Sequence, residues 1–154
     1  MNDEFRRDLI GKSRALCIDY GDRRIGIAIS DIGWSIASPI EVIDTHQVFR
    51  RLFPLISSYE VSVIVIGFPV SLGGESGGAQ AEKVKLFAEK LKELAENRGV
   101  EVQVIFWDER LSTKAAHRIL SEVGATVGLR KRHVDKIAAC FILQGFLEYV
   151  RKSP

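Results

Sequence analysis

The stretch IDYGDRRIGIAISD, residues 18–31, runs from an apolar segment into an aspartate, a tight turn and a second apolar segment. Together with the preceding residues ALC it contains a short continuous apolar run, the pattern of a strand covered on both faces. Gly21 gives the turn the backbone freedom that it needs. The stretch therefore predicts an antiparallel hairpin in which Asp19 stands where a buried strand ends.

The segments that follow predict an alternation of strands and helices. WSIASPIEVI predicts a third strand, with Pro39 suited to the edge of a sheet. Apolar periodicity predicts helices over 46–60, 81–97, about 112–122 and 134–149, and buried strands over 61–67 and 100–107. The order βββαβαβαα is typical of an α/β domain: an antiparallel meander, then strands that helical crossovers make parallel.

The length and composition indicate one ordinary globular domain. A chain of 154 residues, 46% hydrophobic and 27% charged, suits a single domain over 1–154, and we expect residues 1–13 to be a polar leader. The first residues contain no long apolar segment, so we expect no signal peptide, no membrane span and a cytoplasmic location. Cys17 and Cys140 match no metal-ligand spacing and are predicted to be buried free thiols.

The charges are distributed unevenly along the chain. Residues 110–154 contain nine Lys and Arg against three Asp and Glu, whereas residues 1–109 contain thirteen against seventeen. A basic carboxyl-terminal part fits a polyanionic partner, and it equally fits a solvated basic surface. The segment LRKRHVDK, residues 129–136, is the best candidate for contact with a nucleic-acid backbone.

Several carboxylates are predicted to meet at one edge of the sheet. If the first strand pairs in parallel with strand 61–67, and that strand with 100–107, all three end at the edge where open α/β sheets place their sites. This edge would gather Asp19, the loop after Gly67, Asp108 and Glu109. Asp31 ends the antiparallel second strand, so it falls on the opposite edge and is excluded.

The last helix supplies a further acid. Asp135 begins a stripe at helical spacing whose later members are predicted to face inward: Ala139, Ile142, Phe146 and Tyr149. Converging acids repel each other unless a cation lies among them, and carboxylate oxygens suit Mg²⁺ or Mn²⁺. Two such ions about 4 Å apart can activate a water and stabilise the leaving oxygen of a phosphodiester.

Each acid also has a purely structural interpretation. Asp19 fits a turn residue, Glu109 fits an ion pair with Arg110 or an acid at a helix start, and Asp135 fits an acid that offsets a helix dipole. Only their joint placement favours a metal site.

Four motifs in order resemble one known family. CIDYGDRRIGIAISD, IVIGFPVSLGGESG, WDERLST and VDKIAACFILQGFLE are similar to the signature segments of the YqgF/RuvX family, in the ribonuclease H-like superfamily. The resemblance covers residues 15–148. It implies a five-stranded mixed sheet flanked by helices and a hydrolase that cleaves nucleic acid with Mg²⁺ or Mn²⁺, by a two-metal mechanism.

The resemblance also implies roles for particular residues. The metal-binding and catalytic acids would be Asp19, Glu109 and Asp135, with Asp108 as an alternate ligand. The strand that ends at Gly67 lacks the acid found there in many ribonuclease H-like enzymes, so the DER segment must replace it. Contacts to nucleic acid would come from a set of polar and basic residues: Ser71, Arg110, Arg130, Lys131, Arg132 and Lys136. Ser71 stands where the family usually has Asn.

The implied substrate is structured RNA or branched DNA. The first possibility is maturation of the 5′ end of pre-16S ribosomal RNA in ribosome biogenesis, and the second is resolution of Holliday junctions in DNA recombination and repair. The expected oligomeric state is a monomer or a weak homodimer. Two rival interpretations stay open: a non-catalytic nucleic-acid-binding module, and a nucleotide-binding module related to actin-like kinases, whose Asp-x-Gly hairpin resembles residues 19–21.

Overall fold

A computed structural model describes residues 3–69, 78–109 and 131–152 and contains a five-stranded sheet of order β3-β2-β1-β4-β5. β1 pairs antiparallel with β2 and β2 with β3, whereas β1 pairs parallel with β4 and β4 with β5. The mixed sheet predicted from the sequence is confirmed. Its strands are β1 Arg14–Asp19, β2 Arg24–Ser30, β3 Ala37–Asp44, β4 Val61–Phe68 and β5 Gln103–Asp108.

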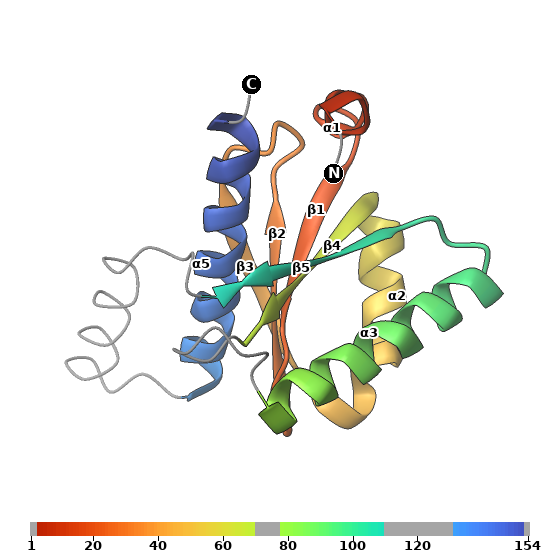
Figure 1. Ribbon diagram of the computed structural model, residues 1–154, viewed down its shortest axis with the longest axis vertical. Helices are drawn as coiled ribbons and strands as arrows, with labels where there is room; N and C mark the ends of the chain where they lie inside the picture. The colour runs from red at the N-terminus through yellow and green to blue at the C-terminus, as the bar shows by residue number, and fades with distance from the viewer. Residues whose placement is uncertain (1–2, 70–77, 110–130, 153–154) are drawn as a thin grey trace.

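Helices cover both faces of this sheet. Figure 1 shows α2 and α3 on one face and α5 on the other. The described helices are α1 Asp3–Leu9, the short 3₁₀ helix η1 Thr45–Gln47, α2 Val48–Ser58, α3 Gly78–Asn97 and α5 Lys131–Lys152. Among them, none is long and apolar enough to cross a membrane.

Some boundaries differ from those predicted. The polar leader contains the helix α1. β3 begins only at Ala37, because residues 31–36 form a turn in which Trp34 has φ +56°. α5 begins at Lys131, so Lys131 and Arg132 belong to the helix and not to a basic loop. The helix predicted near 112–122 lies outside the described residues.

The two faces of the sheet carry side chains of different size. The face toward α2 and α3 is built from large aliphatic residues, among them Leu16, Ile18, Ile27, Ile64 and Ile66. The face toward α5 carries smaller ones: Ala15, Cys17, Ala28, Val63 and Val65. Strand alternation produces this division, since successive side chains point to opposite faces. Small residues allow α5 to approach the sheet closely.

α5 is anchored to β3 by polar contacts. The backbone N–H of Ala37 donates to Gln144 Oε1 at 2.8 Å, and Gln144 Nε2 donates to the carbonyl of Ser35 at 3.1 Å. The Cys140 thiol donates to the Ala37 carbonyl at 3.1 Å. These bonds fix the position of α5 along its length.

The inward stripe of α5 is largely as predicted. Ala139, Ile142 and Phe146 are buried, whereas Tyr149 is 60% exposed and its ring packs against that of Trp107, with centroids 5.2 Å apart. Its neighbour Val150 is buried, so the sheet still covers α5 at this level and Tyr149 lies at the margin of the covered face. Of the two predicted buried thiols, Cys17 is buried but Cys140 is only half-buried, and both are free.

Candidate functional site

The parallel register brings the ends of β1, β4 and β5 to one edge. Ile18 pairs with Ile66, and Gly67 pairs with Trp107. Continued by one residue, the first of these registers places Asp19 beside Gly67. The edge predicted from topology is therefore the edge at which Asp19 lies.

Gly67 provides space for a carboxylate. A Cβ added at Gly67 would lie 3.0 Å from Glu109 Oε1 and 3.0 Å from Ile142 Cδ1. Such contacts are closer than real Cβ atoms normally make. Glu109 therefore lies over Gly67, between the end of β4 and the helix α5. A side chain at position 67 would displace it.

Asp19 and Glu109 both raise the pKa of the same buried thiol, that of Cys17. Cys17 precedes Asp19 by two residues and lies on the α5 face. Burial raises the pKa of the Cys17 thiol well above its usual value, and the negative charges of Asp19 and Glu109 raise it further. Because both carboxylates influence one thiol, they lie in one neighbourhood on the α5 face. This is the pair of predicted site residues that the structure brings together.

Asp108 belongs to the other face. It pairs with Phe68 of β4, and along β5 it follows Val104 and Phe106 at intervals of two residues. These residues pack toward α2 and α3. Strand alternation therefore directs Asp108 toward α3, while Glu109, just past the strand, is directed toward α5. Both residues are half-buried.

The third predicted acid lies in the first turns of α5. Helical periodicity puts position 135 on the same face as Ala139 and Ile142, and Ile142 approaches Gly67. The side chain of Asp135 is outside the described part of the structure. Among the side chains that are described, no group of three His, Cys, Asp or Glu residues that could hold a metal ion is found.

The other predicted contacts to nucleic acid fall mainly outside the described structure. This holds for the whole residues Ser71, Arg110 and Arg130 and for the side chains of Lys131 and Arg132. Lys136 is described and is half-buried in α5.

Asp31 has a structural role at the opposite edge. Its Oδ1 accepts hydrogen bonds from the backbone N–H groups of Ser35, at 2.6 Å, and Ile36, at 2.9 Å. Burial alone would raise the pKa of Asp31, but these backbone donors outweigh it and hold the pKa below its usual value. The carboxylate thus stabilises the turn between β2 and β3.

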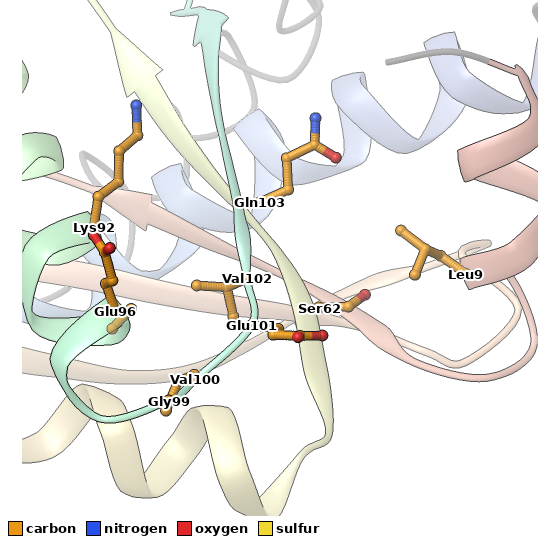
Figure 2. Close-up of a pocket in the computed structure, with 10 residues that line it drawn as sticks. Leu9, Ser62, Lys92, Glu96, Gly99, Val100, Glu101, Val102 and Gln103 are labelled. Carbon is orange, nitrogen blue, oxygen red and sulfur yellow. The ribbon is translucent and has the colours of Figure 1, made fainter.

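Within the described structure, two hollows lie at opposite ends of the sheet. The larger, of about 870 Å³, lies where the end of α3 leads into β5, and Figure 2 shows Lys92, Glu96 and Glu101 in its wall. The Gln103 side-chain oxygen in the same wall is buried and has no hydrogen-bond partner in the described structure. The smaller hollow, of about 320 Å³, is lined by Tyr20, the residue that follows Asp19 in the sequence. Sequence reasoning missed both hollows.

A comparison with known families decides the relationship. The RuvX family model, described as a Holliday junction resolvase, matches residues 13–149. The chain belongs to the RuvX family. The resemblance inferred from four motifs is thereby confirmed, and so is the prediction of a nuclease at the level of the family.

Relatives from several bacteria match the chain over most of its length. A protein of Acetivibrio thermocellus named "Putative pre-16S rRNA nuclease" is 43% identical over 140 residues, covering 88% of this chain and 95% of that protein. A protein of Bacillus thuringiensis with the same name is 40% identical over 141 residues, covering 88% and 98%.

Solved structures with low sequence identity share the fold. Thermus thermophilus RuvC, solved as "T. thermophilus RuvC in complex with Holliday junction substrate", has a TM-score of 0.53 at 14% identity and covers 89% of this chain and 96% of that one. The yeast mitochondrial resolvase Ydc2 has a TM-score of 0.55 at 13% identity and covers 97% and 85%. This RuvX family member therefore has the ribonuclease H-like fold that the sequence predicted.

Proposed function

We propose that this protein is a metal-dependent endonuclease whose reacting phosphate lies between Asp19 and Glu109, at the edge formed by β1, β4 and β5. The observation that carries the proposal is the position of Glu109 over Gly67, next to Asp19. Glu109 occupies a space that a side chain on β4 would fill, and Asp19 ends the neighbouring strand β1. Membership in a nuclease family supports the same reaction class.

The donor set fits a divalent cation. Asp19 and Glu109 offer only hard oxygen ligands, which Mg²⁺ and Mn²⁺ prefer, and Asp135 on α5 is proposed to complete the set. Glu109 is proposed as the ligand from the DER segment rather than Asp108, because Asp108 is directed to the opposite face. When bound, such ions supply an activated water and stabilise negative charge on the phosphate oxygens.

The protein's own residues prepare this site. Gly67 leaves room for Glu109, and Ile142 bounds that room from α5. The raised pKa keeps Cys17 protonated below the two carboxylates, so the thiol adds no third negative charge. Gln144 holds α5 against β3 and so fixes the helix that carries Asp135. The basic residues at the start of α5 are proposed to contact phosphates of the substrate.

The proposed substrate is the 5′ end of pre-16S ribosomal RNA. The names of the relatives support this choice, at identities of 43% and 40% over most of the chain. A four-way DNA junction is the second candidate, favoured by the description of the family model. Symmetric cleavage of a junction needs two active sites, so junction activity would require a dimer.

The test is cleavage of two labelled substrates, a precursor RNA containing the 5′ end of 16S rRNA and a four-way DNA junction. Wild type and Asp19→Asn are compared with Mg²⁺, with Mn²⁺ and with EDTA. We expect metal-dependent cleavage of the RNA, reduced at least about 100-fold in Asp19→Asn, because metal ligation accounts for several kcal/mol of transition-state stabilisation. Gel filtration coupled to light scattering measures the oligomeric state of the same samples.

Asp31→Asn is the matched control, since it makes the same chemical change at the end of the neighbouring strand. It should cleave like wild type. Cleavage of the junction alone would select the DNA substrate. Binding without cleavage of either substrate, in all metals, would replace the proposal with a non-catalytic binding module.

A further inference from the structure

The smaller hollow adjoins the proposed site on the other face of the sheet. Its volume is about 320 Å³, near the lower end of the range for small-molecule sites. Tyr20, which lines it, is the residue directly after Asp19. Strand alternation points Asp19 toward α5 and Tyr20 toward α3. A polymer bound at the edge of the sheet can therefore reach both.

The wall of the hollow is aromatic. The rings of Phe49 and Phe87 stack with centroids 5.2 Å apart and planes 14° apart, and the ring of Tyr20 packs against Phe87 at 5.1 Å. Tyr20 and Phe49 are only partly buried. Leu86, also in the lining, is 64% exposed and contributes little to the core. The hollow thus offers an apolar surface that is partly accessible.

Two lysines of α3 lie at the same hollow. Lys83 and Lys90 are one turn to either side of Leu86 and Phe87, so all four share one helix face. Lys83 pairs with Asp22 at 3.0 Å, and this pair is about half exposed. Exposed ion pairs of this kind are weak, so the ammonium group can turn to a stronger anionic partner.

The position of α3 makes the hollow preformed. Gln80 Nε2 donates to the carbonyl of Tyr20 at 3.4 Å, and the ring of Phe87 on α3 packs against the ring of Tyr20. The first turns of α3 are thus held at the end of β1, beside the proposed site.

Charge distinguishes this hollow from the larger one. The larger cavity carries Glu96 and Glu101 against the single cation Lys92 (Figure 2). Among the described residues, no carboxylate lines the smaller hollow, which carries Lys83 and Lys90. Both lysines form exposed ion pairs outside the lining, with Asp22 at 3.0 Å and with Glu93 at 3.8 Å, and exposed pairs of this kind are weak. The smaller hollow therefore accommodates a polyanionic strand better than the larger cavity does.

We propose that the smaller hollow binds an unpaired nucleobase of the substrate strand, close to the scissile phosphate. The base packs against Tyr20 and Phe49, and Lys83 and Lys90 contact the adjoining phosphates. Aromatic surfaces flanked by cations are the usual means of binding single-stranded nucleic acid. The inference rests on the proposed function, because that function supplies the strand. It implies that the structured substrate has an unpaired nucleotide close to the cleaved bond.

The experiment measures binding in EDTA, where no cleavage occurs. The probes are a fluorescent 12-nucleotide RNA and the same backbone with abasic positions at its centre. Leu86→Glu places a negative charge at the rim of the hollow on an exposed helix position. Lys92→Gln is the matched control: it also lowers the net charge by one, also on α3, but in the larger cavity.

We expect wild type to bind the normal RNA roughly 10-fold more tightly than the abasic one, a ratio within the range for stacking of one base. Leu86→Glu should lose this preference and Lys92→Gln should keep it. Equal weakening by both variants, no preference in wild type, or no binding to either RNA overturns the proposal. Ultraviolet crosslinking of a 5-iodouridine RNA should label Tyr20 or Phe49, and labels confined to other segments also overturn it.

Failure of this inference is separable from failure of the proposed function. If wild type cleaves precursor RNA and Leu86→Glu cleaves it with unchanged kcat and KM, the hollow is not a base site and the nuclease assignment stands. If wild type cleaves no substrate yet prefers the normal RNA, the base site stands and the nuclease assignment fails. A phosphate-free acidic peptide that displaces the RNA from wild type but not from Leu86→Glu would point to a protein partner instead, against the proposal.

Discussion

Asp19 and Asp31 occur in similar positions in the sequence, yet their surroundings differ. Asp19 is the last residue of β1, Asp31 directly follows β2, and each precedes a turn. Asp31 accepts two backbone hydrogen bonds from its own turn, from Ser35 and Ile36, and its pKa is lowered. Asp19 lies instead beside Gly67, in the neighbourhood of a second carboxylate, Glu109.

The comparison shows what separates a structural carboxylate from a candidate catalytic one. The turn around Asp31 satisfies the charge locally, through amides a few residues away. The edge around Asp19 gathers carboxylates from strands that are distant in sequence, a donor set that fits a divalent cation. The position of an aspartate at the end of a strand therefore does not predict its role. The groups that the fold places around the carboxylate decide that role.

The largest expected effect is on cleavage and concerns the second carboxylate. Glu109→Gln should lower the rate at least about 100-fold, because it removes a proposed metal ligand, whereas Asp108→Asn should lower it less than about 10-fold. Initial rates on precursor RNA at saturating Mn²⁺ measure both. A greater loss in Asp108→Asn than in Glu109→Gln would exchange their roles.

The second-largest expected effect is a loss of both cleavage and stability on substitution of Gly67. Gly67→Ala puts a methyl group 3.0 Å from Glu109 Oε1 and from Ile142 Cδ1, so Glu109 or α5 must shift. We expect a loss of about 1–3 kcal/mol in the free energy of unfolding and at least about 10-fold in cleavage. Urea unfolding and cleavage rates test the two parts. Normal activity in a destabilised Gly67→Ala protein would show that Glu109 need not occupy this space.

A smaller effect, on stability alone, is expected at Asp31. Asp31→Ala removes both turn hydrogen bonds and should lower the free energy of unfolding by about 1 kcal/mol at neutral pH, without changing the cleavage rate per folded molecule. Urea titrations of wild type and variant measure the difference. An equal loss of cleavage and of stability would contradict the structural role.

The contribution of Asp31 should also depend on pH. Its pKa is lower in the folded protein than in the unfolded chain, so the charged form is favoured by folding. The stabilisation is fully present above the unfolded pKa, about 3.9, and is lost as the pH falls through the lower folded value. The difference between wild type and Asp31→Ala should therefore be constant from pH 5 to pH 7 and shrink below about pH 4. A difference that grows as the pH falls would contradict a lowered pKa of Asp31 in the folded protein.

The smallest effect concerns the thiol beneath Asp19. Burial and the two carboxylates keep the Cys17 thiol protonated, whereas Cys140 is half-buried and its pKa is raised by burial alone. A thiol reagent should modify Cys140 first and Cys17 only as the protein unfolds. Mass spectrometry of timed samples distinguishes the two sites. Rapid modification of Cys17 in the native protein would show that this region is open.

Much of the fold follows from the sequence because its patterns are local. Continuous apolar runs predict β1 and β4, and helical spacing predicts α3 and its end at Asn97. The parallel pairing that brings Asp19 to Gly67 follows from the crossover connections. The start of β3 did not follow, because Trp34 with its positive φ ends the preceding turn, and aromatic residues rarely adopt that conformation.

The candidate site was predictable only in part. The sequence predicted Asp19 and Glu109 at one edge, but it left Asp108 and Glu109 as alternatives. That choice depends on where alternation stops at the end of β5, which is a property of the folded strand. The sequence indicated only that the strand ending at Gly67 lacks an acid. It could not predict that Gly67 leaves room for Glu109, because residues of other elements bound that space. The aromatic hollow joins η1, α2 and α3 to the end of β1, and no local pattern connects them.

Glu109 over Gly67 has a consequence for how such sequences can change. One volume at the edge of the sheet holds one carboxylate, which can arrive from β4 or from β5 but not from both. Positions 67 and 109 should therefore covary among homologues: a side chain at position 67 should accompany a short residue at 109, and glutamate at 109 should accompany glycine at 67. A substitution at only one of the two positions leaves the site either crowded or empty. We therefore expect substitutions at the two positions to occur together.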